Sequence, residues 1–187
     1  MSKHTVDIED QGIIKVTIQL QTQRLIMRQI NVTDWDFFHF LQTDSTTIKY
    51  SFNPRTETQI RERFESRLPQ WTPASDFWLC LILQEISTHQ RVGLTGFYLQ
   101  NDVAELGYMI APEASGRGYA TESLNGLLEF ADNCGIKRFQ ANVTQGNDAS
   151  ERVLLKSGFH CAEVVKQDVE IGGTMYDDLI YRKVSGG

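Results

Sequence analysis

Short apolar runs, many of them alternating with polar residues, predict the strands of this chain. A strand buried on one face alternates apolar and polar residues, while a fully buried strand is continuously apolar. The resulting predictions are strands at residues 24–30, 76–85, 90–100, 103–110 and 138–144, with a closing pair that turns at Gly172 and Gly173.

Helical spacing of apolar residues predicts four helices, at residues 34–42, 56–68, 119–131 and 147–157. Their ends carry recognisable signals. Thr56 with Gln59 forms a capping box, and Pro69 stops that helix. Asn147 or Asp148 caps the last helix, which ends at Gly158. The order β-α-α-β-β-β-α-β-α-β-β predicts a mixed sheet with helices on both faces.

The chain has no internal repeat and no Pro/Gly/Ser-rich linker, so we expect one domain over residues 21–187. Residues 1–20 are expected to be an N-terminal extension that is disordered or adds a strand through "IIKVTIQLQ". No run approaches the ~20 apolar residues of a membrane span. The polar, acidic start "MSKHTVDIEDQG" lacks the apolar segment of a secretory signal. A cytoplasmic protein with no membrane partner is therefore expected.

Charge and cysteine content exclude several function classes. The 18 basic and 24 acidic residues give a net charge of −6, which argues against a nucleic-acid partner and mildly favours amine substrates. Cys80, Cys134 and Cys161 are odd in number and not closely paired, and the four histidines are scattered. We therefore expect reduced, mostly buried thiols, with neither a disulfide framework nor a metal site.

The segment "PEASGRGYATES", residues 112–123, forms a Gly-rich corner between a predicted strand and the longest predicted helix. Gly116 and Gly118 allow the backbone to approach a ligand closely, and the free amides at a helix start favour an anion. A P-loop would need a lysine here, and the dinucleotide fingerprint would need a third glycine where Thr121 stands. Neither pattern fits, which leaves a plain tight turn or another anion site.

The order strand, Gly-rich corner, long helix, strand and then "N-x-x-S…K-x-G-F" resembles the GNAT family of acetyl-CoA-dependent acyltransferases. The family pattern [Q/R]-x-x-G-x-[G/A] is matched by Gly118-x-Ala120, with Ser115 at the usual Gln or Arg position. That departure matters little, because backbone amides hold the pyrophosphate.

Further motifs resemble the Rim-type branch of ribosomal-protein N-terminal acetyltransferases, over residues 21 to 183. They are "TQRLIMRQINVTDWDFFHFLQ", "AELGYMIAPEASGRGYATES", "NDASERVLLKSGF" and "MYDDLIYR".

The resemblance implies an α/β fold with a mostly antiparallel sheet of six to seven strands, splayed at its centre. It also implies acetyl-CoA as co-substrate. The pantetheine arm would pair with the splayed strand, and the pyrophosphate would lie on the amides of the corner. Arg152 and Lys156 either meet the phosphates or form a solvated face. The implied cofactor-binding residues are Met109, Ile110, Ser115, Gly116, Arg117, Gly118, Tyr119, Ala120, Thr121 and Asn147.

The resemblance also implies catalytic residues. Glu105 lies where many members carry a glutamate base, and Glu170 lies where the Rim-type branch has an acidic residue, with Asp168 as an alternative. Many members use a tyrosine as the acid, but Leu154 stands at that position here. Ser150, three residues after Asn147, is the remaining candidate. The amide of a strand residue such as Met109 is expected to hold the oxyanion.

Three functions remain open at this stage. The first is acetylation of a protein N-terminal α-amine, plausibly ribosomal. This amine has a pKa near ~8 against ~10.4 for lysine, and so suits an enzyme without a clear strong base. The second is acetylation of a small amine such as a polyamine, amino acid or antibiotic. The third is a coenzyme-A-binding module that transfers nothing.

The acceptor site is expected in two variable segments. Residues 43–56 carry Lys49, Tyr50, Phe52 and Arg55, and residues 168–176 lie in the last hairpin. The final strand is expected to be exposed and could pair with a second copy in a homodimer.

Overall fold

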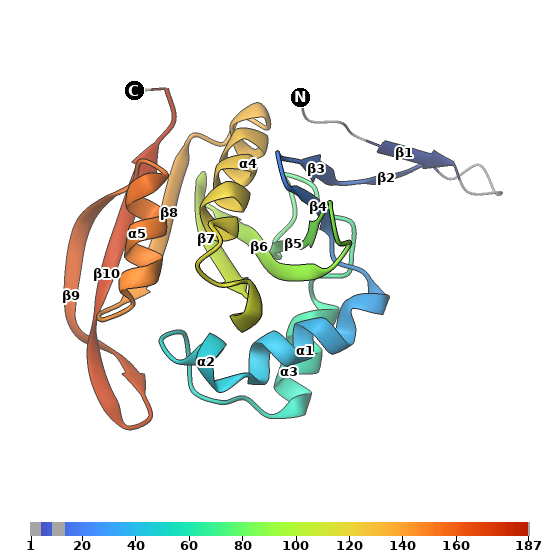
Figure 1. The fold of residues 1–187 in the computed structure, drawn as a ribbon. Helices are drawn as coiled ribbons and strands as arrows, with labels where there is room; N and C mark the ends of the chain where they lie inside the picture. The colour runs from blue at the N-terminus through green and yellow to red at the C-terminus, as the bar shows by residue number, and fades with distance from the viewer. Residues whose placement is uncertain (1–4, 9–13, 187) are drawn as a thin grey trace.

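Eight strands form one sheet in the order β3-β4-β5-β6-β7-β8-β10-β9 in the computed structural model, which describes residues 5–8 and 14–186 (Figure 1). The α/β class and the mostly antiparallel sheet are confirmed. The sheet exceeds the six or seven strands expected, because β3 pairs with β4 at one edge. A separate two-stranded sheet joins β1 (Thr5–Ile8) and β2 (Ile14–Thr17). The strands of the main sheet are β3 (Gln19–Gln21), β4 (Leu25–Gln29), β5 (Leu79–Glu85), β6 (Arg91–Gln100), β7 (Val103–Ile110), β8 (Arg138–Thr144), β9 (His160–Ile171) and β10 (Thr174–Val184).

All four predicted helices are present, and side-chain caps mark the start of two of them, α3 and α5. The side chain of Thr56 accepts from the amide of Gln59, which completes the predicted capping box of α3. Asn147 caps α5 through the amide of Ser150. A short α2 was not expected, and α3 ends before the predicted residue 68. The helices are α1 (Trp35–Thr43), α2 (Ser45–Ile48), α3 (Glu57–Glu65), α4 (Tyr119–Asn133) and α5 (Asp148–Lys156), with 3-10 turns at Val32–Asp34 and Pro112–Ala114.

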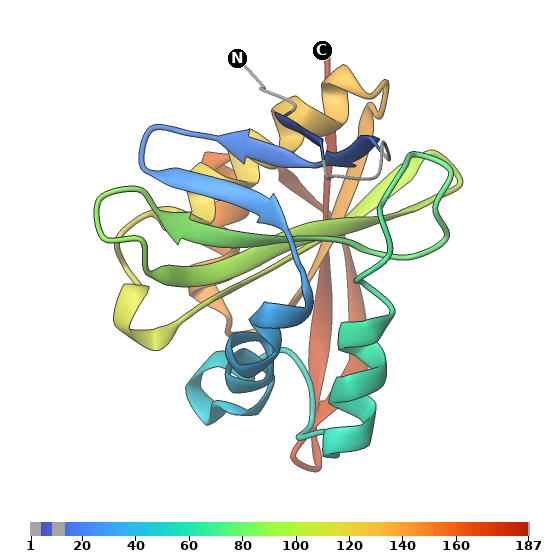
Figure 2. The same ribbon diagram turned by 90° about the vertical axis from the view of Figure 1, so that its right-hand side faces the viewer.

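Helices cover both faces of the sheet (Figures 1 and 2). Helices α4 and α5 lie together on one face, and α1 packs with α3, which covers the opposite face. Alternation along β7 sorts its side chains accordingly. Ala104 and Leu106 are buried, whereas Glu105 is exposed and Gly107 lies against the ring of Trp78 on the opposite face.

The sheet opens between β7 and β8, which form its one parallel pair among the described strands. They pair only from Val103–Arg138 to Glu105–Gln140, and beyond Glu105 the two strands diverge. The backbone of β7 from residue 106 onward therefore has a partner only on its β6 side. This is the splay that the resemblance implied.

The last strand of the chain is not at the edge of the sheet, contrary to expectation. Strand β10 pairs with both β8 and β9, so β9 is the exposed edge. The expectation of mostly buried thiols is also wrong. Cys80 is buried in β5, but Cys134 and Cys161 are exposed.

Candidate active site

The Gly-rich corner presents a row of free amides. Gly116 and Gly118 have φ values of +76° and +83°, a left-handed conformation that favours glycine. Gly118 is the N-cap of α4 and supplies no side-chain cap. Within the described part of the chain, no group accepts from the amides of residues 116–121. Free donors at the start of a fifteen-residue helix form an anion site.

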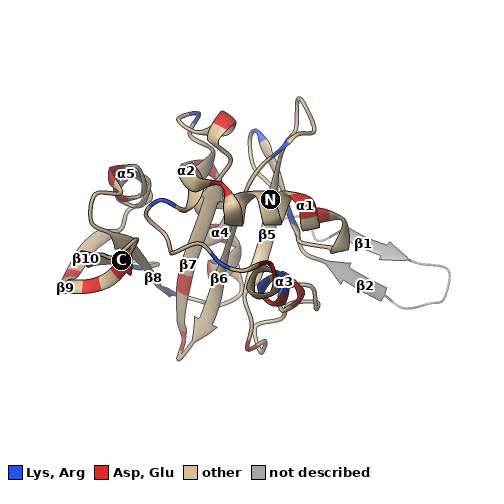
Figure 3. Cartoon of the chain, turned by 90° about the horizontal axis from the view of Figure 1, so that it is seen from below, with Lys and Arg blue, Asp and Glu red and all other residues tan. Residues whose placement is uncertain are grey.

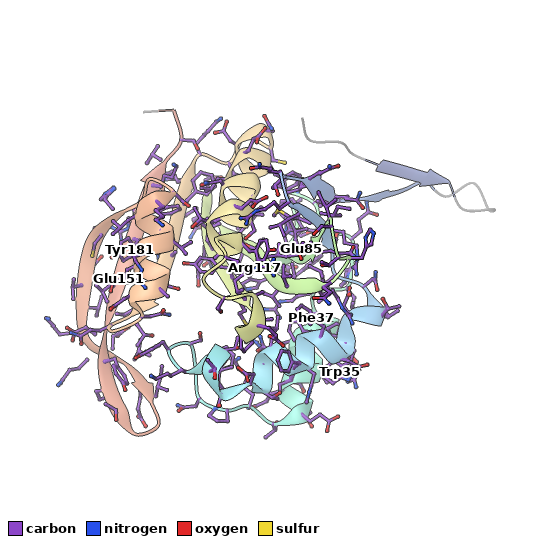
Figure 4. The ribbon with its side chains drawn as sticks, viewed as in Figure 1. Trp35, Phe37, Glu85, Arg117, Glu151 and Tyr181 are labelled. Carbon is purple, nitrogen blue, oxygen red and sulfur yellow. The ribbon has the colours of Figure 1, made fainter. Side chains whose placement is uncertain are left out.

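Glu85, at the end of β5, holds this corner in place through two side-chain hydrogen bonds. Its carboxylate accepts from the Tyr119 hydroxyl and from the Arg117 guanidinium at 2.9 Å (Figure 4). The hydrogen bonds donated by Tyr119 and Thr88, together with Arg117, hold the pKa of Glu85 below its ordinary value. The side chains of Arg117 and Tyr119 are thus engaged within the protein, which leaves the backbone of the corner for a ligand.

A cavity of about 380 Å³, the corner cavity, lies between the corner and α5. Except for Arg117, every residue expected to bind the cofactor lines it. Arg152 and Lys156 also line it, and neither makes an ion pair within the described part of the chain. The expected cofactor-binding residues that line this cavity are Met109, Ile110, Ser115, Gly116, Gly118, Tyr119, Ala120, Thr121 and Asn147.

A second cavity of about 440 Å³, the arginine cavity, reaches across the splay to the side of α1 and α3. Its lining includes Arg55, Arg63 and Arg67, and it also includes Asn142 and Val143 of β8 and Asp178 of β10. Tyr50 and Phe52, from the expected acceptor segment, also line it. Both cavities share the residues Ser51, Tyr108, Met109, Asn147 and Ser150. Two reactants that entered from opposite sides would meet at these five residues.

The direction of the β7 amides changes one expectation. The amide of Ala111 donates to Val92 in β6 at 3.0 Å. Amides alternate in direction along a strand, so that of Met109 also faces β6, while those of Tyr108 and Ile110 face the splay. Tyr108 lines both cavities and Ile110 only the corner cavity. The amide of Tyr108, rather than that of Met109, is therefore the donor nearest the meeting point.

Helix α5 supplies the groups opposite β7. The side-chain oxygen of Asn147 caps the helix, because it accepts a hydrogen bond of 3.2 Å from the Ser150 amide. Asn147 also lines both cavities. Ser150 is half-buried at the meeting point, and Leu154 is fully buried. The Tyr181 hydroxyl donates to Glu151 at 2.6 Å and ties the helix to β10 (Figure 4).

The three candidate carboxylates differ in whether they line a cavity. Glu105 is exposed and lines the arginine cavity. Glu170 does not line the arginine cavity, because side chains alternate along β9 and the neighbouring Val169 lines it instead. The main-chain carbonyl of Glu170 accepts a hydrogen bond from Asn53. Asp168 does not line either cavity.

Sequence reasoning did not single out Asp178, which is 5% exposed and lines the arginine cavity. It accepts from Asn142 at 2.6 Å. Burial, with the negative charge of Asp168 adding to it, raises the pKa of Asp178 above its ordinary value. Two adjacent aspartates in "MYDDLIYR" gave no signal of which one would be buried.

Two further features are absent from the described residues. None of their helices is both long and apolar enough to cross a bilayer. They bring together no group of three His, Cys, Asp or Glu side chains that could hold a metal ion.

A splayed mixed sheet beside an uncapped, Gly-rich helix start defines the class of acyl-coenzyme-A-dependent transferases. Residues 24–160 match the family model described as an acetyltransferase (GNAT) domain, which is well over half of the chain. The chain therefore belongs to the GNAT family and is an acetyl-CoA-dependent N-acetyltransferase. Membership gives no support to the alternative of a binding module that transfers nothing.

Individual relatives agree with this assignment. An uncharacterized N-acetyltransferase, YoaA of Bacillus subtilis, is 30% identical over 87% of this chain and 94% of its own. Two solved structures share the fold. The first is a RimL ribosomal L7/L12 alpha-N-protein acetyltransferase in complex with coenzyme A, with TM-score 0.74 and 17% identity over 87% of this chain and 95% of its own. The second is spermidine N-acetyltransferase from Vibrio cholerae in complex with CoA and spermine, with TM-score 0.75 and 19% identity over 86% and 95%.

Proposed function

We propose that this enzyme acetylates the N-terminal α-amine of a protein, with acetyl-CoA in the corner cavity and the amine in the arginine cavity. The observation that carries the proposal is the set of five residues at which the two cavities meet. An acceptor of the ribosomal-protein type and a cytoplasmic location belong to the same proposal, supported by the likeness to the RimL structure.

The free amides of residues 116–121 would hold the pyrophosphate, and the backbone of Ile110 would pair with the pantetheine arm. The amine nitrogen attacks the thioester carbonyl carbon, and the carbon–sulfur bond breaks. The amide of Tyr108 would stabilise the oxyanion that forms. Ser150 would pass a proton to the leaving thiolate, directly or through water, and its hydroxyl would regain a proton from water.

A carboxylate would take the proton that the amine loses, directly or through water. Asp178 is the stronger candidate, because its raised pKa lies closer to neutral pH, where a general base is most effective. Glu105 lines the same cavity and is the second candidate. Glu170 is third, since it lies outside both cavities.

One feature favours a small amine as an alternative acceptor. The side chain of Asn53 bridges to the β9–β10 hairpin, donating to Glu170 at 3.0 Å and accepting from Gly172 at 2.7 Å. This bridge ties together the two segments in which the acceptor site was expected, and a fixed pairing of these segments suits a small amine better than a peptide.

Thiol release from acetyl-CoA, measured against short peptides and small amines, tests the proposal. Peptides should turn over only with a free N-terminus, and N-terminally blocked peptides that contain lysine should not react. Turnover confined to small amines would transfer the function to the alternative acceptor.

A further inference from the structure

Three arginines lie near one another in the lining of the arginine cavity. Arg63 and Arg67 are one helical turn apart, so they lie on the same side of α3 and its extension, and Arg55 precedes that helix. The guanidinium of Arg67 lies 5.6 Å from the ring centre of Phe38 and 5.9 Å from that of Trp78, both of which line the cavity. The helix carries basic and acidic positions side by side (Figure 3).

These arginines have no acidic partner among residues 5–8 and 14–186. No carboxylate lies within 4.0 Å of any of the three, although arginines elsewhere, such as Arg28 and Arg117, form ion pairs. Burial, reinforced by the charges of Arg63 and Arg67, lowers the pKa of Arg55 to about 10. Like charges held together in a partly desolvated place are unfavourable unless an anion joins them.

The cluster is connected to the reaction centre by hydrogen bonds. The guanidinium of Arg55 donates to the Gln42 side-chain oxygen at 2.9 Å, and the Gln42 amide donates to the Met109 sulfur at 3.1 Å. Met109 is one of the residues where the cavities meet. Met109 and the three arginines line the same cavity, so a single ligand in that cavity can extend from that point to the arginines.

The lining of the arginine cavity carries charges of both signs. Glu105 and Asp178 are its acidic lining residues, and neither forms an ion pair with an arginine of the cluster. The carboxylates suit an amine, and the guanidinium groups suit a carboxylate or phosphate, which they can bind through two parallel hydrogen bonds.

We propose that the acceptor carries an anionic group, a carboxylate or a phosphate, besides its primary amine, and that Arg55, Arg63 and Arg67 bind this group. The inference rests on the proposed function in that it places the acceptor in the arginine cavity. A peptide with acidic residues directly after its N-terminal residue meets this requirement. Polyamines are disfavoured, because their additional charges are positive.

Three peptides that differ only in charge test the proposal: Ser-Asp-Asp, Ser-Asn-Asn and Ser-Lys-Lys, each followed by the same neutral residues. Thiol release should give the acidic peptide a kcat/KM roughly tenfold or more above that of the neutral one. The lysine peptide and spermine should be the poorest substrates. The acidic preference should weaken at high salt, because salt screens an exposed charge pair.

Arg63 is exposed, so its replacement should leave folding intact. Arg63→Gln should raise KM for the acidic peptide and remove most of its advantage over the neutral peptide, while Arg63→Glu should reverse the preference. Arg61→Gln is the matched control on the same helix. Arg61 lies over the ring of Trp35 at 3.4 Å and lines neither cavity, so the preference should persist.

The outcomes separate this inference from the proposed function. Equal turnover of the acidic and neutral peptides would overturn the inference and leave the peptide acceptor in place. Turnover of glutamate and aminoethyl phosphate, but of no peptide and not of ethanolamine, would support the inference and reject the peptide acceptor. A preference unchanged by Arg63→Glu would also overturn it.

Discussion

The hydroxyl of Tyr108 donates a hydrogen bond to the main-chain carbonyl of Ser150 at 3.2 Å, and so bridges the splay between β7 and α5. Burial raises the pKa of Tyr108 to about 12, so this hydroxyl stays protonated at working pH. Two hydroxyl-bearing residues therefore meet at the reaction centre, although the tyrosine position common in the family holds Leu154 here.

Ser150→Ala should lower kcat about 100-fold, as expected for loss of a general acid, with KM for acetyl-CoA unchanged. Tyr108→Phe should lower kcat less than tenfold and the free energy of unfolding by about 1 kcal/mol, the value of one hydrogen bond. Thiol release measures kcat and denaturant unfolding measures the free energy of unfolding of the two variants. Ser87→Ala, at an exposed turn, is the control. The reverse ranking of the two variants would make Tyr108 the acid.

The ionisation of two adjacent aspartates, Asp177 and Asp178, should change the stability of the fold in opposite directions. The raised pKa of Asp178 means that the folded state binds its proton more tightly than the unfolded state does. Its ionisation therefore costs stability, and the cost grows as pH rises from its unfolded pKa to its folded pKa. Asp178→Asn should raise the Tm at neutral pH, yet lower kcat by about 100-fold or more if Asp178 is the base.

Asp177→Asn is the matched comparison. The hydrogen bonds from the Lys166 ammonium and the Gln167 amide lower the pKa of Asp177, so its ionised form stabilises the fold above the unfolded pKa. This stabilisation is lost as pH falls through the folded pKa. Asp177→Asn should therefore lower the Tm at neutral pH. Thermal scans from pH 4 to 8 would contradict the argument if both variants shifted the Tm in the same direction.

The corner glycines should affect coenzyme binding separately from stability. Gly116 and Gly135 both have left-handed φ values, +76° and +84°, and a Cβ at either would meet nothing within 4 Å. Each Gly→Ala change should thus cost about 1–2 kcal/mol of stability through backbone strain alone. Only Gly116→Ala should raise KM for acetyl-CoA, because only Gly116 lines the corner cavity. An equal rise in Gly135→Ala would show that the effect is general.

Stability in acid should depend on Asp34. Its carboxylate is fully buried and accepts two hydrogen bonds of 2.7 Å from Arg28. Burial raises the pKa of Asp34, but the bonds from Arg28 and the Asn31 amide outweigh burial, and the net pKa is lowered. The carboxylate therefore stabilises the fold above its unfolded pKa, and this contribution is lost as pH falls through the folded pKa.

Asp34→Ala should cost about 3 kcal/mol or more at neutral pH, because it leaves the Arg28 charge without its partner. Urea unfolding at pH 7 and pH 4 measures this loss. Asp36→Ala, on the first turn of α1, is the control, and equal losses in the two variants would contradict the assignment.

Local signals in the sequence predicted the helices and strands and the proposed coenzyme site. The capping box at Thr56, the cap at Asn147 and the glycines at 116 and 118 act on neighbouring backbone, so they can be read without a fold. Because backbone amides, rather than particular side chains, form the anion site, Ser115 could replace the usual Gln or Arg without obscuring it.

Only the tertiary structure defines the proposed acceptor site. No sequence motif marked Arg63 or Arg67, and only the fold places them along one cavity with Asp178. The burial of Asp178, the facing of the Tyr108 amide and the edge position of β9 all follow from strand pairing between distant segments. Such pairing depends on register and long-range contact, which no short stretch of sequence encodes.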